Sequence, residues 1–179
     1  MSANIRVLIS EGEIDRRLNE IAAEIMRDFE GKEVMLVCVL KGASIFMVDL
    51  ARKITGKVAS VTFDFMDVSS YGSATVSKGI VKIDKDLTTP ITDKHVLLVE
   101  DIIDTGQTLN RLIEYLKTKQ PASLKTCVLL DKPERRVAEA NHITPDYIGF
   151  KIPNEFVVGY GLDYDELYRN LPYVGVVSL

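Results

Sequence analysis

The sequence predicts an α/β fold with a mainly parallel, twisted sheet flanked by helices. Two continuous apolar runs, at 34–40 and 96–99, are typical of strands that are buried on both faces. Segments with apolar residues at helical spacing alternate with these runs, which predicts βαβ units. The chain has 179 residues, which suits one domain with its own core, and we interpret residues 1–179 as a single domain.

The first elements are a short strand at 5–9 and a helix that follows it directly. Ser10 and Glu13 form the S-x-x-E pattern of a capping box, which begins a helix. The apolar stripe of this helix consists of Ile14, Leu18, Ile21 and Ile25. Gly31 marks its end, because glycine readily adopts the left-handed conformation that ends helices.

A strand, a helix and a second strand come next. The run 34–40 predicts a buried strand, and a helix of about 44–54 ends before Gly56. A half-buried strand is predicted by three apolar residues that alternate with polar or small ones, Val61, Phe63 and Phe65. The stretch 69–79 is small, polar and glycine-bearing, so we expect a long loop that returns to a strand at 79–83.

The remaining elements complete the sheet. The strand at 96–99 leads to a helix marked by Leu109, Leu112, Ile113 and Leu116. Further strands are predicted at 124–130, 147–152, 156–160 and 173–177. Because sites in parallel sheets lie at the carboxyl ends of the strands, we expect functional residues after positions 40, 99 and 130.

The composition excludes several classes of protein. The formal net charge is -4, whereas a nucleic-acid-binding protein needs a basic face, so no nucleic-acid partner is expected. No apolar run approaches the roughly 20 residues of a membrane helix, and the N-terminus lacks a signal-peptide pattern. Cys38 and Cys127 lie in apolar runs, as buried, reduced thiols do. We therefore expect a cytoplasmic protein with no membrane partner.

Three acidic residues and a glycine-containing helix start follow the strand at 96–99. Glu100 and Asp101 are adjacent, Asp104 comes next, and Thr105-Gly106-Gln107-Thr108 leads into the helix. A helix N-terminus offers free backbone N–H groups, and glycine allows a close approach, so the segment is typical of a phosphate cradle. The carboxylates would repel a phosphate and suit sugar hydroxyls, a metal ion or a proton transfer. The alternative interpretation is that Asp104 or Thr105 simply caps the helix.

These residues resemble a known family. The stretch 96–108, VLLVEDIIDTGQT, closely resembles the signature with which type I phosphoribosyltransferases bind phosphoribosyl pyrophosphate (PRPP), in the form of the hypoxanthine-guanine branch. The resemblance continues, in the family's order, through 40–42, Ser70-Tyr71, Lys132, 156–160 and 162–164. It implies the type I phosphoribosyltransferase fold, in which a small hood subdomain is formed by the N- and C-terminal segments.

The resemblance assigns the sugar phosphate to the segment after the strand. Glu100 and Asp101 would hold the ribose 2′- and 3′-hydroxyls. The 5′-phosphate would be wrapped by Asp104, Thr105, Gly106, Gln107 and Thr108. Asp104 would also face purine N7 as the general base, and is thus the predicted catalytic residue.

A pyrophosphate site and a metal site are also implied by the resemblance. Lys41 and Gly42 would form a pyrophosphate-binding loop with a cis peptide at Leu40-Lys41, and Arg169 would bind the same group. The implied cofactor is Mg²⁺, associated with Glu100, Asp101 and Asp163. Without the family, a solvated lysine, a helix cap and a surface ion pair are the simpler interpretations of Lys41, Asp163 and Arg169.

The purine site would lie near the C-terminal part of the chain. Lys132 would donate to O6 of the base, Phe156 would stack on the purine, and the Val157 backbone would meet the base edge, with Asp163 nearby. A donor at O6 suits a 6-oxopurine and opposes the 6-amino group of adenine. A solvated lysine and a core aromatic are the alternatives for Lys132 and Phe156.

The resemblance implies an enzyme, a hypoxanthine(-guanine) phosphoribosyltransferase that converts PRPP and a 6-oxopurine base into IMP or GMP. Ser70 and Tyr71 would belong to a lid that closes over the reacting centre. A homodimer or homotetramer is expected. The preference among hypoxanthine, guanine and xanthine stays open, as do two alternatives: a PRPP-sensing regulator without catalysis, and a transferase for another base.

Overall fold

The computed structural model describes residues 4–70, 81–140 and 142–178 and contains two sheets. The larger sheet has six strands in the order β4-β3-β2-β5-β6-β7. Their bounds are β2 Glu33–Leu40, β3 Ser60–Ser70, β4 Val81–Lys85, β5 His95–Ile103, β6 Ser123–Asp131 and β7 Tyr147–Lys151. All neighbouring pairs are parallel except β3 and β4, which pair antiparallel at one edge.

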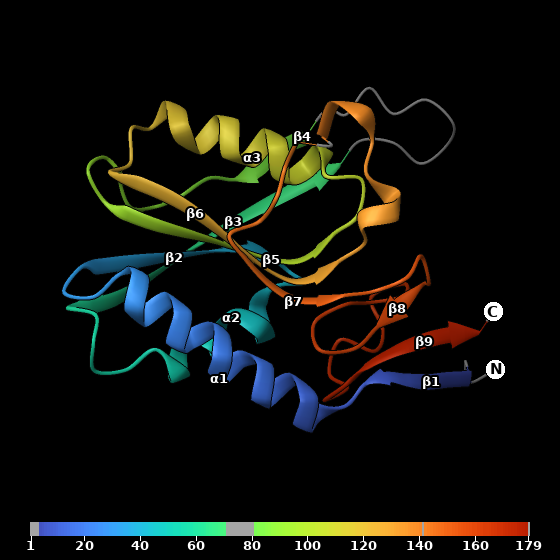
Figure 1. Ribbon diagram of the computed structural model, residues 1–179. Helices are drawn as coiled ribbons and strands as arrows, with labels where there is room; N and C mark the ends of the chain where they lie inside the picture. The colour runs from blue at the N-terminus through green and yellow to red at the C-terminus, as the bar shows by residue number, and fades with distance from the viewer. Residues whose placement is uncertain (1–3, 71–80, 141, 179) are drawn as a thin grey trace.

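Helices cover both faces of this sheet (Figure 1). Helices α1 (Glu11–Asp28) and α2 (Ser44–Lys53) lie on one face, and α3 (Gln107–Thr118) lies on the other. The central strands β2 and β5 are therefore buried on both sides, which explains why their sequences are continuous apolar runs. The mainly parallel α/β fold predicted from the sequence is confirmed.

The helix starts and stops agree with local sequence signals. The Ser10 and Glu13 capping box is complete: the Ser10 N–H donates to Glu13 Oε2 at 2.8 Å, and the Glu13 N–H donates to Ser10 Oγ at 3.4 Å. The apolar stripe of α1 is fully buried against α2 and the sheet. Gly31 has a positive φ of 72° just after the helix ends.

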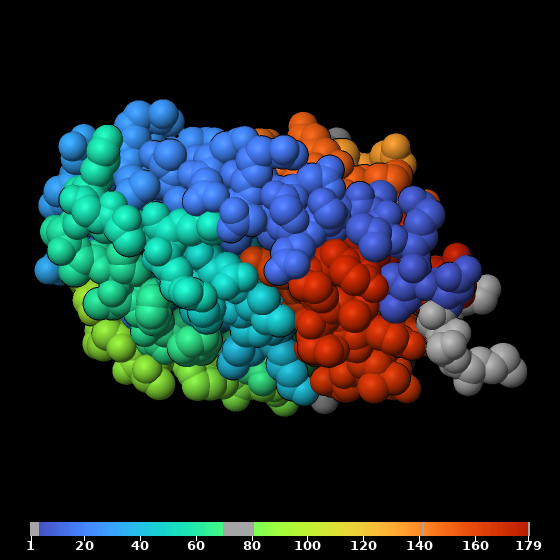
Figure 2. All heavy atoms as spheres, turned by 90° about the horizontal axis from the view of Figure 1, so that it is seen from below, coloured from blue at the N-terminus to red at the C-terminus, as the bar shows by residue number. Residues whose placement is uncertain are grey.

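A second, three-stranded sheet joins the two ends of the described chain. Its antiparallel order is β1-β9-β8, with β1 at Asn4–Ile9, β8 at Val157–Val158 and β9 at Val174–Ser178. This sheet lies beside the carboxyl ends of the larger sheet, next to the start of α1 (Figure 1). The space-filling view shows the N-terminal and C-terminal segments adjoining on one face (Figure 2). We call this sheet, with its connecting segments, the hood.

Three details differ from the sequence-based expectations. Strand β3 extends through Ser70 because it pairs with β4, so residues 69 and 70 of the expected loop lie in a strand, and its residues 71–79 lie outside the described residues. Strand β5 continues to Ile103, so Glu100 and Asp101 lie within it and not after it. Phe63 was expected in the buried half of its strand, but it is 52% exposed.

Two short 3-10 helices connect β6 to β7: η1 at Pro133–Arg135 and η2 at Ala138–Ala140. Among the described residues, no helix combines the length and the apolar character needed to cross a bilayer. The assignment of residues 1–179 to one domain stays a prediction.

Candidate functional site

A cavity of about 280 Å³ lies at the carboxyl ends of β2 and β5, where the sequence predicted the site. Its lining consists of the end of β2, one residue of β3 and the whole segment from Glu100 to the first turn of α3, namely Val39, Leu40, Val68, Glu100, Asp101, Ile102, Ile103, Asp104, Thr105, Gly106, Thr108 and Leu109. Parallel strands bring their carboxyl ends to the same edge of a sheet, which explains how these segments meet.

Glu100 and Asp101 are two adjacent acidic residues in the lining of this cavity. Glu100 is 7% exposed, and burial, together with the neighbouring Asp101 charge, raises its pKa well above the ordinary value. Burial also raises the pKa of Asp101, to about 6, while the positive charge of Arg169 lowers it and the negative charge of Asp163 raises it. Cys38 lies close to these carboxylates, and burial and their charges raise the pKa of its thiol to about 12. A buried carboxylate next to a half-buried one is typical of sites that bind a cation or a diol.

The loop between β5 and α3 has the form of a phosphate cradle. Gly106 is the N-cap of α3 and has a left-handed backbone with φ 84°, which a residue with a side chain rarely adopts. Thr105 Oγ1 accepts a hydrogen bond from the Gln107 N–H at 3.4 Å. The N-terminus of α3 carries a positive partial charge, and this favours an anion at the loop.

Asp104 lies beside two cationic side chains. Its Oδ1 accepts a hydrogen bond from Arg135 Nε at 2.9 Å, and both side chains are nearly half exposed. Lys132 is 7% exposed, and burial lowers its pKa, while the negative charge of Asp104 opposes that shift. The predicted base-binding lysine and the predicted general base are therefore electrostatic neighbours.

Gly42 connects three segments that are far apart in the sequence. The peptide between Leu40 and Lys41 is cis, as the resemblance implied. A Cβ atom built on Gly42 would lie 1.6 Å from Asp101 Oδ2, so the backbone here touches the β5 carboxylate. A Cβ atom on Gly161 would lie 2.0 Å from the Gly42 carbonyl oxygen. The loop after β2 is thus held between β5 and the hood.

An ion-pair network of the hood faces this loop. Arg169 Nη1 donates to the Gly161 carbonyl at 2.8 Å, and its Nη2 pairs with Asp163 at 2.9 Å and with Glu166 at 3.4 Å. Lys41 Nζ pairs with the other oxygen of Glu166 at 3.0 Å. The two cations predicted to bind pyrophosphate are therefore brought together by one carboxylate.

Two of the predicted purine residues, Phe156 and Val157, lie at the start of β8. Phe156 is 48% exposed, and its ring meets the Tyr164 ring edge to face, with 5.6 Å between the ring centroids. Val157 is buried in β8, where it pairs with Val176. An exposed aromatic ring next to a buried strand is available for stacking, which the alternative of a core aromatic does not explain.

Comparisons with known proteins agree with this geometry. The family model described as the phosphoribosyl transferase domain matches residues 10–165. A hypoxanthine-guanine phosphoribosyltransferase of Streptococcus pneumoniae is 50% identical over 173 residues, which is 97% of this chain and 93% of that protein. The chain belongs to the phosphoribosyltransferase family.

Solved structures and a longer protein extend the comparison. A crystal structure of a hypoxanthine phosphoribosyltransferase from Staphylococcus aureus matches with a TM-score of 0.89 at 47% identity, over 97% of this chain and 91% of that one. A bifunctional TilS/HprT protein of Listeria monocytogenes is 49% identical over 173 residues, but this chain spans only 26% of its length. The type I fold and the hypoxanthine-guanine branch expected from the sequence are confirmed.

Several residues around the site of this phosphoribosyltransferase were not predicted from the sequence. They are Arg135 and Arg136, which contact the phosphate loop, Gly161, which touches Gly42, and Glu166, which joins Lys41 to Arg169. Arg135 and Arg136 follow Lys132 closely, but a charged run after a strand is usually solvated, so no local signal distinguishes them. Of the two predicted lid residues, Ser70 ends β3, and Tyr71 lies outside the described residues.

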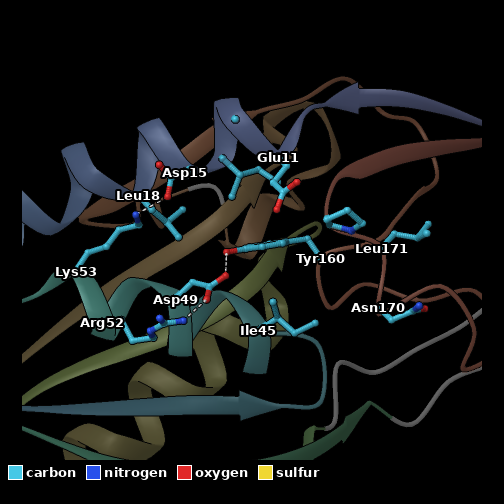
Figure 3. A pocket seen from close by; sticks show the side chains of 13 residues that line it. Glu11, Asp15, Leu18, Ile45, Asp49, Arg52, Lys53, Tyr160, Asn170 and Leu171 are labelled. Carbon is cyan, nitrogen blue, oxygen red and sulfur yellow. Dashed lines mark hydrogen bonds and ion pairs between the residues drawn. The ribbon is translucent and has the colours of Figure 1, made fainter.

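A larger cavity, of about 770 Å³, lies between the hood and the helices α1 and α2, and none of the predicted site residues line it. It is bounded by α1, α2 and the segment at 170–172 (Figure 3). Tyr160 projects into it and donates to Asp49 Oδ2 at 2.7 Å, which ties the hood to α2. The smaller cavity, which the predicted residues of the β5–α3 segment line, is therefore the candidate site.

Proposed function

We propose that this phosphoribosyltransferase acts in purine salvage. It transfers the 5-phosphoribosyl group of PRPP to N9 of hypoxanthine, guanine or both, and the products are IMP or GMP and pyrophosphate. The observation that carries this proposal is the cavity in which Glu100 and Asp101 adjoin a phosphate-type loop at the start of α3. Carboxylates for a diol and free amides for a phosphate are what a ribose 5-phosphate requires.

Asp104 is the proposed catalytic residue. It lies at the mouth of the same loop, partly exposed and next to Lys132, so a purine whose O6 meets Lys132 would bring N7 toward its carboxylate. The ribose C1′ should develop positive charge as its bond to pyrophosphate breaks, as in other glycosyl transfers. A carboxylate at this position would stabilise that charge and hold the purine proton.

Lys41 and Arg169 are proposed to receive the leaving pyrophosphate. Both now pair with Glu166, and the pair between Lys41 and Glu166 is mostly exposed, with 62% and 64% of the side chains accessible. Exposed ion pairs contribute little free energy, so a more highly charged anion would replace the Glu166 carboxylate readily. The backbone of Gly42 lies beside the same position.

The donor set is compatible with Mg²⁺ as cofactor. Glu100 is buried, Asp101 is half-buried, and the two carboxylates repel each other. The charge of Asp163 adds to this repulsion, and a divalent cation would relieve it. Within the described residues no three acidic, histidine or cysteine side chains converge to hold a metal, so substrate oxygens would complete the coordination. The ion would offset the charge that grows on pyrophosphate.

A coupled assay tests the proposal. The protein is incubated with Mg²⁺ and PRPP and with hypoxanthine, guanine, xanthine, adenine or uracil in turn, and the nucleotide formed is measured. We expect IMP or GMP, with the highest kcat/KM for a 6-oxopurine, because Lys132 opposes a 6-amino group. Formation of AMP or UMP alone would assign a different base. If the protein binds PRPP but forms no nucleotide, the second candidate, a PRPP-sensing regulator, is favoured. Such a regulator needs a basic surface for nucleic acid, and the net charge of -4 argues against one.

Assembly into a homodimer or homotetramer and a cytoplasmic location are also proposed. A homodimer or homotetramer is supported by two exposed apolar side chains on the face that carries α2, Val48 at 47% and Phe63 at 52%. A cytoplasmic location is supported by Cys38 and Cys127, which are buried, free thiols. Substrates are PRPP and the base, and neither nucleic acid nor membrane is an expected partner.

A further inference from the structure

Arg136 lies beneath the phosphate loop and contacts its backbone directly. Its side chain is 7% exposed, and Nη2 pairs at 2.5 Å with Asp131, whose side chain is 6% exposed. Nη1 donates to the carbonyl oxygens of Asp104 at 2.6 Å, Ile103 at 3.2 Å and Lys132 at 3.4 Å. The stem packs on the loop, because a Cβ atom on Gly106 would lie 3.1 Å from Arg136 Cδ.

Three successive carbonyl groups of the loop are held by the segment that contains Arg136. The Ile103 carbonyl accepts from the Lys132 N–H at 3.0 Å as well as from Arg136, and the Asp104 carbonyl accepts from Arg136. The Thr105 carbonyl accepts from the N–H of residue 137 at 3.2 Å. Every peptide plane from 103 to 106 is therefore fixed from one side.

Fixing the carbonyls also fixes the amides. In a trans peptide the C=O of one residue and the N–H of the next point in opposite directions. The N–H groups of Asp104 and Thr105 must therefore point away from Arg136, and the Gly106 N–H must point away from the N–H of residue 137. Within the described residues, no hydrogen bond to protein occupies these three N–H groups. Their residues line the smaller cavity, so successive amides converge there as they do in an anion-binding nest.

Stability alone is a weak explanation for this arrangement. The desolvation of a buried ion pair commonly cancels its attraction, and an apolar pair of the same volume would pack as well. An apolar pair, however, could not donate a hydrogen bond to the Asp104 carbonyl as Arg136 does. A guanidinium can serve a carboxylate and several carbonyls at once, because its donors lie in a fixed plane.

We propose that Arg136 is a positioning residue for the 5′-phosphate, which it recognises only through the backbone. Anchored by Asp131, it orients the two peptide planes that carry the Ile103 and Asp104 carbonyls, so that the amides of residues 104 and 105 are preorganised for the phosphate, and the N–H of residue 137 holds the next plane. The inference rests on the proposed function, because it assumes that this loop binds the phosphate of PRPP and of the product.

The test compares a ligand that has the 5′-phosphate with one that lacks it. Dissociation constants for IMP and inosine are measured by calorimetry for the parent enzyme, Arg136→Lys and Arg136→Met. Arg17→Met is the matched control, because Arg17 also donates to backbone carbonyls, those of Ile148 and Gly149 in β7, and none of its hydrogen bonds to the described residues goes to the loop between β5 and α3. Circular dichroism and thermal unfolding establish that each variant is folded.

We expect IMP affinity to fall on the order of tenfold or more in both Arg136 variants, with inosine affinity unchanged. In steady-state kinetics, KM for PRPP should rise more than kcat falls, since the lost interaction is made in the ground state and the transition state alike. Arg17→Met should retain both affinities. If Arg136→Met does not fold, Arg136→Lys decides, since it keeps the charge beside Asp131 but not the planar donors.

Two results would overturn the proposal: a folded Arg136 variant that binds IMP as the parent does, or one that loses IMP and inosine affinity equally. The second would show general damage to the site. Failure of the proposed function is distinguishable, because the parent enzyme itself would then bind IMP no better than inosine.

Discussion

Gly42 has no room for a side chain, because the Asp101 carboxylate lies directly against its backbone. The nearest atoms to a Cβ built there are Oδ2 and Cγ of Asp101, at 1.6 and 2.6 Å. Asp101 cannot easily move aside, because its Oδ1 accepts from the Ile102 N–H at 2.7 Å. The backbone at Gly42 and the carboxylate at Asp101 therefore define each other's position.

Gly42→Ala should lower kcat/KM for PRPP on the order of 10²-fold, because the added methyl group displaces either the loop or Asp101 by about 1 Å. Initial-rate kinetics with hypoxanthine measure the effect. Gly12→Ala is the control: nothing lies within 4 Å of a Cβ there, and alanine should stabilise α1 by up to about 1 kcal/mol without a kinetic change. Equal activities of the two variants would contradict the proposed role of Gly42.

Asp104→Asn should leave folding intact and lower kcat by a factor on the order of 10² or more, because the amide cannot accept the purine proton. The side chain is 42% exposed, so little structure depends on its charge. Single-turnover kinetics measure the chemical step, and PRPP affinity serves as the internal control, since the phosphate loop is unchanged. A variant with near-normal turnover would remove Asp104 from the catalytic role.

At the scale of elements, the C-terminal end of α1 is attached to the sheet by Asp28. Its Oδ2 accepts from Tyr147 Oη in β7 at 2.7 Å and from Lys125 Nζ in β6 at 2.9 Å. The hydrogen bond from Lys125, with that from Tyr147, holds the pKa of Asp28 below its ordinary value of 3.8. The ionised form of this carboxylate is thus the one that favours the folded state.

Asp28→Asn should reduce the free energy of unfolding at pH 7 by about 1 kcal/mol, a small value because the group is partly exposed and screened by solvent. A pKa that is lower in the folded state means that the unfolded state binds more protons. The stabilisation is therefore complete above the unfolded pKa near 3.8 and is lost as the pH falls through the lower, folded value.

Urea unfolding at pH 7 and at pH 3 measures this effect, and the difference between parent and variant should narrow at pH 3. Glu30→Gln is the control, because Glu30 is exposed and has no ion pair among the described residues. A difference that stays constant across the two pH values would show that the Asp28 charge is not its cause.

Elements whose signals are local were predictable from the sequence, and contacts between distant segments were not. The apolar runs of β2 and β5 and the capping box of α1 depend on neighbouring residues alone. The extension of β3 depends on its pairing with β4, and the roles of Arg136 and Glu166 depend on which loops meet at the carboxyl edge. The spacing of apolar residues along the sequence carries no information on contacts between distant segments.

The same limit applies to the candidate site. The family's motif supplied Asp104 and the phosphate loop, because these residues are consecutive in the chain. It did not supply Gly161, which matters only because the hood carries it to within contact of Gly42. The roles assigned to Lys132, Phe156 and Arg169 stay predictions until a ligand is bound.

At the scale of the whole molecule, the site lies where the hood meets the larger sheet. Gly42 and Asp101 belong to the sheet, whereas Gly161 and Arg169 belong to the hood segment that covers them. Tyr160 and Asp49 add a second link between the hood and α2. A ligand that contacts both parts should therefore stabilise the protein as a unit.

PRPP with Mg²⁺ should raise the free energy of unfolding by about 2.7 kcal/mol when its concentration is 100 times its dissociation constant. For a chain of this size, the midpoint of thermal unfolding should rise by about 5 to 10 °C. Scanning calorimetry measures the shift, and a chelator in place of Mg²⁺ should reduce it. An unchanged midpoint at saturating PRPP would contradict binding at this junction.

The pairing of β1 with β9 has a consequence for the order of assembly during translation. In the register of this pair, Asn4 lies opposite Ser178. A ribosome therefore exposes β1 before every other described strand, and its partner β9 only after all of them. The nascent chain can complete its parallel strands early, but the hood sheet must wait for β9. An unfinished chain would hold the loop between β5 and α3 without the completed hood beside it.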